Sequence, residues 1–177
     1  MRVGFIGRFQ PFHKGHFKAV KSLEKDHEVV IVVGVAEEPS RDNPLSFKQR
    51  KQIIEECFPS KEIVGIEDRE SDEEWARELE ERIDLDGIAS RNPETIKAVE
   101  ENPALEIIEH ELHQKGIYSG TEVRRRLRSG EEWRYLVPKC CEEKVADLTE
   151  VFKGSGINYE FKPGWKRENS YYDTLDD

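Results

Sequence analysis

Short runs of apolar, mostly β-branched residues alternate along the chain with longer segments in which apolar residues recur every three or four positions. An unbroken apolar run is typical of a buried strand, and the wider spacing is typical of an amphipathic helix. The clearest strand is "EVVIVV", residues 28–33, whose apolar character predicts burial on both faces. The predicted strands are residues 2–6, 28–33, 62–66, 87–90 and 105–109. Strands separated by helices pair in parallel, so we expect an α/β fold: a Rossmann-like open parallel sheet of about five strands with helices on both faces.

The helices predicted between these strands have recognisable ends. Ser46 is a candidate N-cap, and Gly130 is a typical stop. Ser119 and Glu122 have the spacing of a capping box ahead of a short basic helix. The predicted helices are one ending near residue 24, one from 46 to 58, one from about 72 to 83, one opening at 93, one from 119 to 130 and one from 138 to 151. We expect one domain over residues 1–152 and an irregular tail over 153–177, where no period is visible.

The charge of the chain excludes several classes of partner. Lys and Arg number 28 against 38 Asp and Glu in 177 residues, a formal net charge of −10. Broad attraction to nucleic acid or to an anionic membrane is therefore excluded, and an anionic ligand needs a local basic cluster. No apolar run approaches the ~20 residues that span a bilayer, and no signal-peptide pattern opens the chain, so we expect a cytoplasmic protein.

The three cysteines are Cys57, Cys140 and Cys141, and two of them are adjacent. This spacing indicates neither a disulfide framework nor a metal site. We therefore expect core or surface thiols.

The segment "GRFQPFHKGH", residues 7–16, follows the first predicted strand and opens the first helix. Ligands of open parallel sheets bind at the carboxyl ends of the strands. His13 and His16 lie three apart and share one face of the first helical turn, where N–H groups and the helix dipole favour an anion. Further residues would turn the chain, add positive charge or leave room for the ligand: Gly7, Arg8, Lys14 and Gly15. The pattern predicts a phosphate site.

A second basic cluster follows a Ser-Gly-Thr turn, and its arginines are Arg124, Arg125, Arg126 and Arg128. Guanidinium groups suit polyphosphate oxygens, and the hydroxyls of Ser119 and Thr121 either cap the helix or reach a phosphate. Some of these arginines form a solvated helix face paired with Glu122 or Glu131. Arg124, the nearest to the start of the helix, is the candidate ligand.

Both segments resemble motifs of the nucleotidyltransferase superfamily of adenylyl- and cytidylyltransferases. The run 13–16 resembles its His-x-Gly-His motif, and Ser119, Thr121 and Arg124 match its Ser-x-Thr-x-x-Arg turn. The form "GRFQPFH", with Trp75 upstream of a Ser-x-Asn-Pro segment at 90–93, is most similar to archaeal-type nicotinamide-nucleotide adenylyltransferase. The resemblance covers roughly residues 2–140.

This resemblance implies transfer of AMP from ATP to nicotinamide mononucleotide (NMN), giving NAD and pyrophosphate by direct in-line attack without a covalent enzyme intermediate. His16 would stabilise the α-phosphate, with His13 and Lys14 beside it, and Arg8 and Arg124 would hold the β- and γ-phosphates. Mg²⁺ would accompany ATP, mostly coordinated by water, so no residue is expected as a metal ligand. The other nucleotide-binding residues would be Gly7, Phe9, Gly15, Asn92, Ser119 and Thr121.

The acceptor side would include Gly34, Ala36 and Trp75, with the indole of Trp75 stacked on the nicotinamide ring. Trp75 also shares a stripe with Leu79 and Ile83, so a core tryptophan is the alternative. The loop 35–44 departs from the family pattern, which leaves the acceptor open. The alternatives are a sister enzyme acting on flavin mononucleotide, phosphopantetheine or a phosphoalcohol, and a nucleotide-binding regulator without turnover. Relatives also suggest a homo-oligomer.

Overall fold

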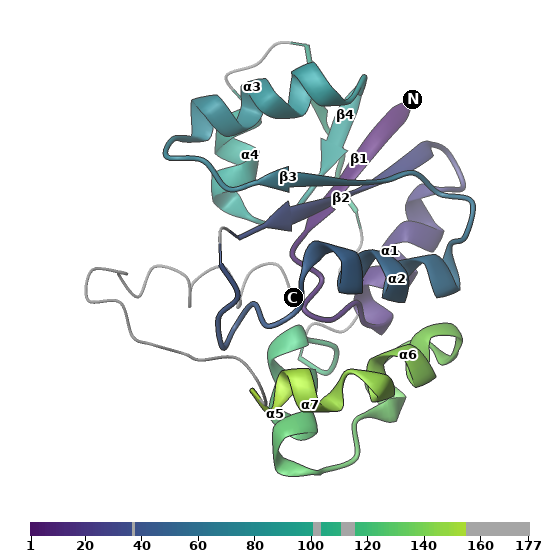
Figure 1. Ribbon diagram of the computed structural model, residues 1–177. Helices are drawn as coiled ribbons and strands as arrows, with labels where there is room; N and C mark the ends of the chain where they lie inside the picture. Colours follow the sequence, from purple (N-terminus) through teal and green to yellow (C-terminus); the bar gives the residue numbers. More distant parts are fainter. Residues whose placement is uncertain (37, 101–103, 111–115, 155–177) are drawn as a thin grey trace.

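Five strands pair in parallel in one sheet in the computed structural model, which describes residues 1–36, 38–100, 104–110 and 116–154 (Figure 1). The strands are β1 (Arg2–Gly7), β2 (Glu28–Val35), β3 (Ile63–Glu67), β4 (Gly87–Ala89) and β5 (Glu106–Ile107). The predicted α/β fold is confirmed. The fifth strand is shorter than expected, since only two of the five predicted residues pair with β4.

The sheet has the order β3-β2-β1-β4-β5, so the chain builds outward from β1 and then returns to its other side. Val3 pairs with Val29 of β2 and with Gly87 of β4. The connections that leave β1 and β4 therefore run in opposite directions. Such a reversal opens a crevice at the carboxyl ends of the two strands, where ligands of this architecture bind.

Helices cover both faces of the sheet, and each face has its own core. One core contains Phe5 and Ile31, and the other contains their neighbours Ile6 and Val32, because successive side chains of a strand point to opposite faces. On the first face lie α1 (Lys14–Leu23) and α2 (Phe47–Cys57), followed by α5 (Gly120–Ser129), η1 (Arg134–Leu136), η2 (Lys139–Cys141), α6 (Glu142–Asp147) and α7 (Thr149–Phe152). On the second lie α3 (Asp72–Arg82) and α4 (Pro93–Glu100).

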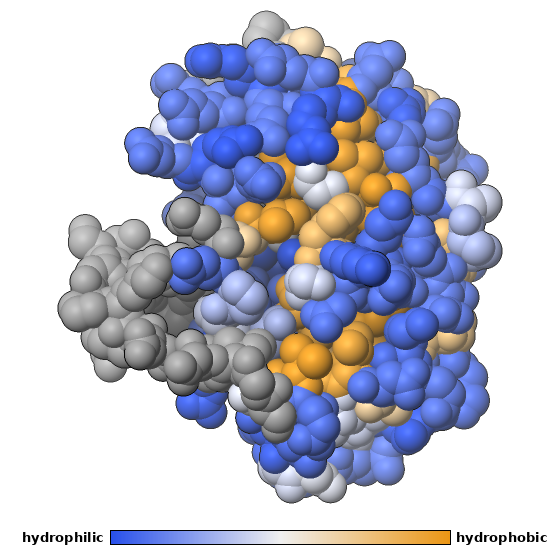
Figure 2. Space-filling model, in the orientation of Figure 1, coloured by the Kyte–Doolittle hydropathy of each residue, from blue (hydrophilic) through white to orange (hydrophobic). Residues whose placement is uncertain are grey.

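The surface is mostly polar in the view of Figure 2, and apolar residues gather over the middle of this face. Within the ranges that the structure describes, no helix is both long and apolar enough to cross a membrane.

The single helix predicted over 138–151 is wrong. The chain instead forms η2 and two short helices, α6 and α7, which meet at Leu148. The Thr149 hydroxyl donates to the carbonyl oxygen of Ala146 at 2.7 Å, satisfying a carbonyl that a continuous helix would pair. This break directs Phe152 into the core beside α5. The predicted tail lies outside the described residues from 155 onward, and the domain boundary stays a prediction.

The expectation for the cysteines is also wrong in part. Cys57 at the end of α2 forms a disulfide with Cys140 of η2, and only Cys141 is a free, buried thiol. Sequence spacing missed this bond because the partners lie 83 residues apart and only the packing of η2 on α2 brings them together.

Breaking this disulfide is expected to lower the free energy of unfolding by about 2–4 kcal/mol, because a cross-link across a long loop restricts the unfolded chain. Chemical denaturation of C57S and of the reduced wild type should show the same loss. Thiol titration of the denatured, unreduced protein should find only Cys141 reactive. Titration of all three cysteines before reduction would contradict the assignment.

Candidate functional site

The two histidines of the first motif form the N-terminal cap of α1. His13 is the N-cap residue, and its Nδ1 accepts from the backbone N–H of Gly15 at 3.1 Å. His16 Nδ1 accepts in return from the backbone N–H of His13 at 3.3 Å. The two rings are stacked with their centroids 3.6 Å apart. His13 thus precedes the first helical turn instead of lying in it, although the rings do share one face as expected.

These caps fix the protonation pattern of both rings. A neutral imidazole whose Nδ1 accepts a hydrogen bond carries its proton on Nε2. Each histidine is therefore a hydrogen-bond donor through Nε2, the atom that the cap does not use. A pair of donors at a helix N-terminus suits the oxygens of a phosphate.

Two aromatic side chains pack against the His16 ring and hold it in place. Phe9 meets it edge-on with centroids 4.8 Å apart, and Phe12 stacks on it at 5.6 Å. Phe9 is 1% exposed, so its side chain lies in the core and acts by packing, and its expected contact with the nucleotide stays a prediction. Gly15 has a packing role beside its expected nucleotide contact, which stays a prediction: a Cβ there would lie 2.9 Å from His13 Cε1. Its missing side chain makes room for the His13 ring.

Arg124 joins the second motif to the first. It is 2% exposed, its Nη1 donates to the carbonyl oxygen of Gln10 at 2.8 Å, and its Nη2 donates to Thr121 Oγ1 at 3.2 Å. The Ser119 hydroxyl caps α5 by accepting from the Glu122 N–H at 3.1 Å, which is one of the two roles expected of it, and its contact with a phosphate stays a prediction. The guanidinium is thus held against the β1–α1 turn.

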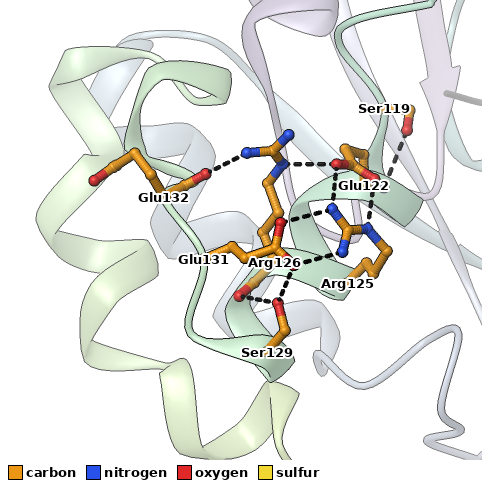
Figure 3. A network of polar contacts seen from close by, with 7 residues as sticks. All are labelled: Ser119, Glu122, Arg125, Arg126, Ser129, Glu131 and Glu132. Atoms are coloured by element: carbon orange, nitrogen blue, oxygen red, sulfur yellow. Dashed lines mark hydrogen bonds and ion pairs between the residues drawn. The ribbon is translucent and has the colours of Figure 1, made fainter.

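Arg125 and Arg126 belong to a surface network (Figure 3), whereas Arg128 Nε donates to the carbonyl oxygen of Phe152 at 2.9 Å. Arg125 pairs with Glu122 and Glu131, and Arg126 bonds Glu122 at 2.6 Å. Hydrogen bonds from Arg125 and Arg126 lower the pKa of the Glu122 carboxyl to about 2. The predicted capping box is only half formed, because the Glu122 carboxylate serves these arginines while its N–H serves Ser119.

A cavity of about 230 Å³ lies at the crevice. The ends of β1 and β2 border it, together with residues that follow β1, β3 and β4. The predicted residues that line it are Gly7, Arg8, Gly34, Trp75 and Asn92. Trp75 is half-buried, lines this cavity and also packs against the second core, and its stacking on an acceptor ring stays a prediction. The Asn92 side chain accepts from the Glu94 N–H at 2.9 Å, which fixes its orientation at the start of α4. Gly7 and Asn92, which lie 85 positions apart in the sequence, thus line the same cavity.

Two residues of the site were missed by the sequence analysis. Asp68 Oδ2 accepts from Arg8 Nη1 at 2.9 Å and lines the same cavity. Arg50 is 2% exposed, and its Nη1 donates to the carbonyl oxygens of Arg8 at 2.7 Å and Gly34 at 2.6 Å. Burial, with the nearby Arg8 charge, lowers the pKa of Arg50 to about 10. The sequence does contain a sign of this role, because Arg50 lies three positions before Ile53 and therefore on the buried stripe of α2.

Ala36 lies apart from the other acceptor-side residues, in a second cavity of about 190 Å³ under the β2–α2 loop. Lys14 is the half-buried first residue of α1. Within the described ranges, no three His, Cys, Asp or Glu side chains gather as a metal site.

Comparison with known proteins decides the family. The sequence model described as cytidylyltransferase-like matches residues 4–126. A nicotinamide-nucleotide adenylyltransferase of Methanosarcina acetivorans is 33% identical over 158 residues, which span 85% of this chain and 91% of the relative. The chain belongs to the cytidylyltransferase-like family, among the nicotinamide-nucleotide adenylyltransferases. The enzyme of the same name from Methanococcus aeolicus is 31% identical over 145 residues, 78% of this chain and 84% of the relative.

Solved structures confirm the fold. A bifunctional NMN adenylyltransferase/ADP ribose pyrophosphatase from Francisella tularensis, complexed with AMP and a manganese ion, matches with a TM-score of 0.66 and 23% identity over 86% of this chain. A NadR protein in complex with NAD and AMP-PNP matches with a TM-score of 0.56 and 20% identity over 76% of this chain. The match spans about half of each solved chain, at 51% and 45%.

Proposed function

We propose that this protein is a nucleotidyltransferase that moves the adenylyl group of ATP to NMN, giving NAD and pyrophosphate. The observation that carries the proposal is the histidine cap of α1, which presents two Nε2–H donors beside the Arg8 turn at the switch point of the sheet. The close relatives in this family carry the name of that activity.

The reaction needs positioning and charge stabilisation more than bond chemistry by the protein. An oxygen of the NMN phosphate attacks the α-phosphorus of ATP. The bond that breaks joins this phosphorus to the oxygen bridging the α- and β-phosphates. The electron pair leaves with pyrophosphate. Because the attacking phosphate is already ionised, the protein supplies neither a nucleophile nor a base.

Each proposed role follows from a side chain's place. His16, held by Phe9 and Phe12, would donate Nε2–H to an α-phosphoryl oxygen as negative charge grows there, with His13 and Lys14 beside it. Arg8 and Arg124 would hold the β- and γ-phosphates at the two ends of the β1–α1 turn. The Asp68 carboxylate holds Arg8 at the edge of the acceptor cavity.

A divalent metal, for which we propose Mg²⁺, would enter with the triphosphate. The carboxylates that line the larger cavity are Asp68, Asp72 and Glu94, and Asp68 already pairs with Arg8. This donor set fits a cation held mainly by phosphate oxygens and water, and no protein ligand is assigned. The metal would neutralise charge on the leaving pyrophosphate. A cytoplasmic location and a homo-oligomeric state stay predictions.

One assay tests the function. The purified protein is incubated with ATP and Mg²⁺ against NMN, flavin mononucleotide, phosphopantetheine and a phosphoalcohol, and pyrophosphate release is measured. We expect release with NMN and formation of NAD. Release with another acceptor alone would retain the transferase and refute the NMN assignment, and no release with any acceptor would favour a regulator.

Replacing Trp75 by leucine is expected to raise the KM for NMN about tenfold and to leave the KM for ATP unchanged. The indole lines the cavity, and a cationic ring stacked on it gains about 0.5–2 kcal/mol. W75F, which keeps an aromatic face, should lie between W75L and the wild type. Steady-state kinetics with each substrate varied gives the comparison. A fall in thermal stability with both KM values unchanged would leave Trp75 a core residue only.

A further inference from the structure

We infer that Gln10 is a positioning residue that fixes the β2–α2 loop, described at residue 36 and over residues 38–46, onto the β1–α1 turn and thereby sets the affinity for the acceptor. The inference deepens the proposed function and rests on it. Gln10 takes no part in bond making, and its side chain bonds the loop at Leu45.

The Gln10 side chain bonds the loop in the way that a neighbouring strand would. Its Nε2 donates to the carbonyl oxygen of Leu45 at 2.9 Å, and its Oε1 accepts from the N–H of Leu45 at 2.9 Å. Gln10 is 2% exposed and Leu45 is also 2% exposed, so water does not replace these bonds when they are lost. Removing the amide therefore leaves two buried backbone groups unpaired, which is more costly than losing surface contacts.

The turn that carries Gln10 depends on outside support. Phe9 has a φ of 52°, in the left-handed region that residues with a Cβ adopt at a cost. Arg50 Nη1 donates to the carbonyl oxygen of Arg8, and Arg124 Nη1 donates to the carbonyl oxygen of Gln10. The two arginines thus hold the backbone of the turn, while the Gln10 side chain is left to hold the loop.

The loop lines the second cavity of the site together with Gln10 and Arg50. It follows β2, whose Gly34 lines the cavity of Trp75. Asn43 lines this second cavity with a buried Oδ1 that has no hydrogen-bond partner in the part of the chain that the structure describes. Ala36, which is expected on the acceptor side, lines this second cavity as well. A displacement of the loop would therefore change the surface that meets the acceptor and leave the caps of α1 and α5 in place.

Two substitutions separate the bonds of the amide from its bulk. Q10M keeps the length of the side chain and removes both hydrogen bonds. Q10E keeps an acceptor for the Leu45 N–H but sets a carboxylate oxygen against the Leu45 carbonyl. Q52M is the matched control, because Gln52 is an exposed glutamine on α2, the helix that follows the loop.

The experiment measures KM for NMN and for ATP, the Kd of NMN alone by calorimetry, and the thermal unfolding midpoint. For Q10M we expect the KM and Kd of NMN to rise about tenfold while the KM for ATP changes less than about twofold, and for Q52M neither changes. For Q10E the NMN affinity relative to wild type should recover as the pH is lowered, because a protonated carboxyl donates to the Leu45 carbonyl as the amide does.

Equal rises in both KM values, or a lower unfolding midpoint with both KM values unchanged, would overturn the inference and leave Gln10 a structural residue. Failure of the proposed function is seen separately, in the wild type, as no pyrophosphate release with NMN, and it removes the basis of the inference as well.

Discussion

Replacing His16 by glutamine is expected to lower kcat about 10²–10³-fold with little change in stability. Glutamine at the third helical position can still accept from the His13 N–H and so complete the capping box. Its side chain cannot place a donor at the position of the imidazole Nε2–H, because that position depends on the ring that Phe9 and Phe12 hold. Loss of one preorganised donor to the charge that grows in the transition state has this magnitude. Single-turnover and steady-state rates of pyrophosphate release give the measurement.

Two companion variants show whether the effect is chemical. H16A removes the donor and also the His16 half of the capping box, while the His13 cap on Gly15 stays. We expect kcat to fall as in H16Q, with a loss of about 1 kcal/mol in the free energy of unfolding. H27A is the control, since His27 precedes β2 at the opposite edge of the sheet. It should keep kcat within about twofold of the wild type. Wild-type kcat in H16Q would mean that His16 serves α1 alone.

The sequence predicted β1, β2 and β4 well because these strands are mostly buried and carry almost unbroken apolar runs. It also predicted which loops meet, since the carboxyl ends of parallel strands share one edge. Gly7, Arg8, Gly34, Trp75 and Asn92 line one cavity as a result. These predictions depend on local pattern and on a topological rule, and neither needs side-chain detail.

The predictions that were wrong or absent depend on contacts between distant segments. The Cys57–Cys140 bond exists because η2 packs on α2, and Arg50 matters because its helix aims it at two backbone carbonyls. Gly15 makes room for the His13 ring and Phe9 supports His16, roles that the sequence analysis did not predict beside the expected nucleotide contacts. Motif matching finds the residues near a site, but it does not distinguish those that touch a ligand from those that hold them.

Arg124 combines a structural role, holding the β1–α1 turn, with a proposed contact to phosphate. We expect R124K to lower kcat/KM for ATP about 100-fold. Lysine keeps the charge but presents a single nitrogen, so it cannot bond the Gln10 carbonyl and Thr121 Oγ1 and still offer a planar fork to phosphate. Loss of two charge-assisted hydrogen bonds, each about 1.5–3 kcal/mol, accounts for at least this factor. Varying ATP at saturating NMN gives the ratio.

The neighbouring arginine provides the control for this prediction. Arg125 lies on the exposed side of α5 and pairs with Glu122 and Glu131, and surface pairs of this kind contribute about 0–1 kcal/mol to stability. R125K should therefore leave kcat/KM for ATP within about twofold of the wild type. Because both variants exchange the same two residue types on one helix, a difference between them reports the buried position of Arg124 and not the loss of a guanidinium as such. Equal losses in R124K and R125K would place the polyphosphate on the outer face of α5, against the arrangement proposed here.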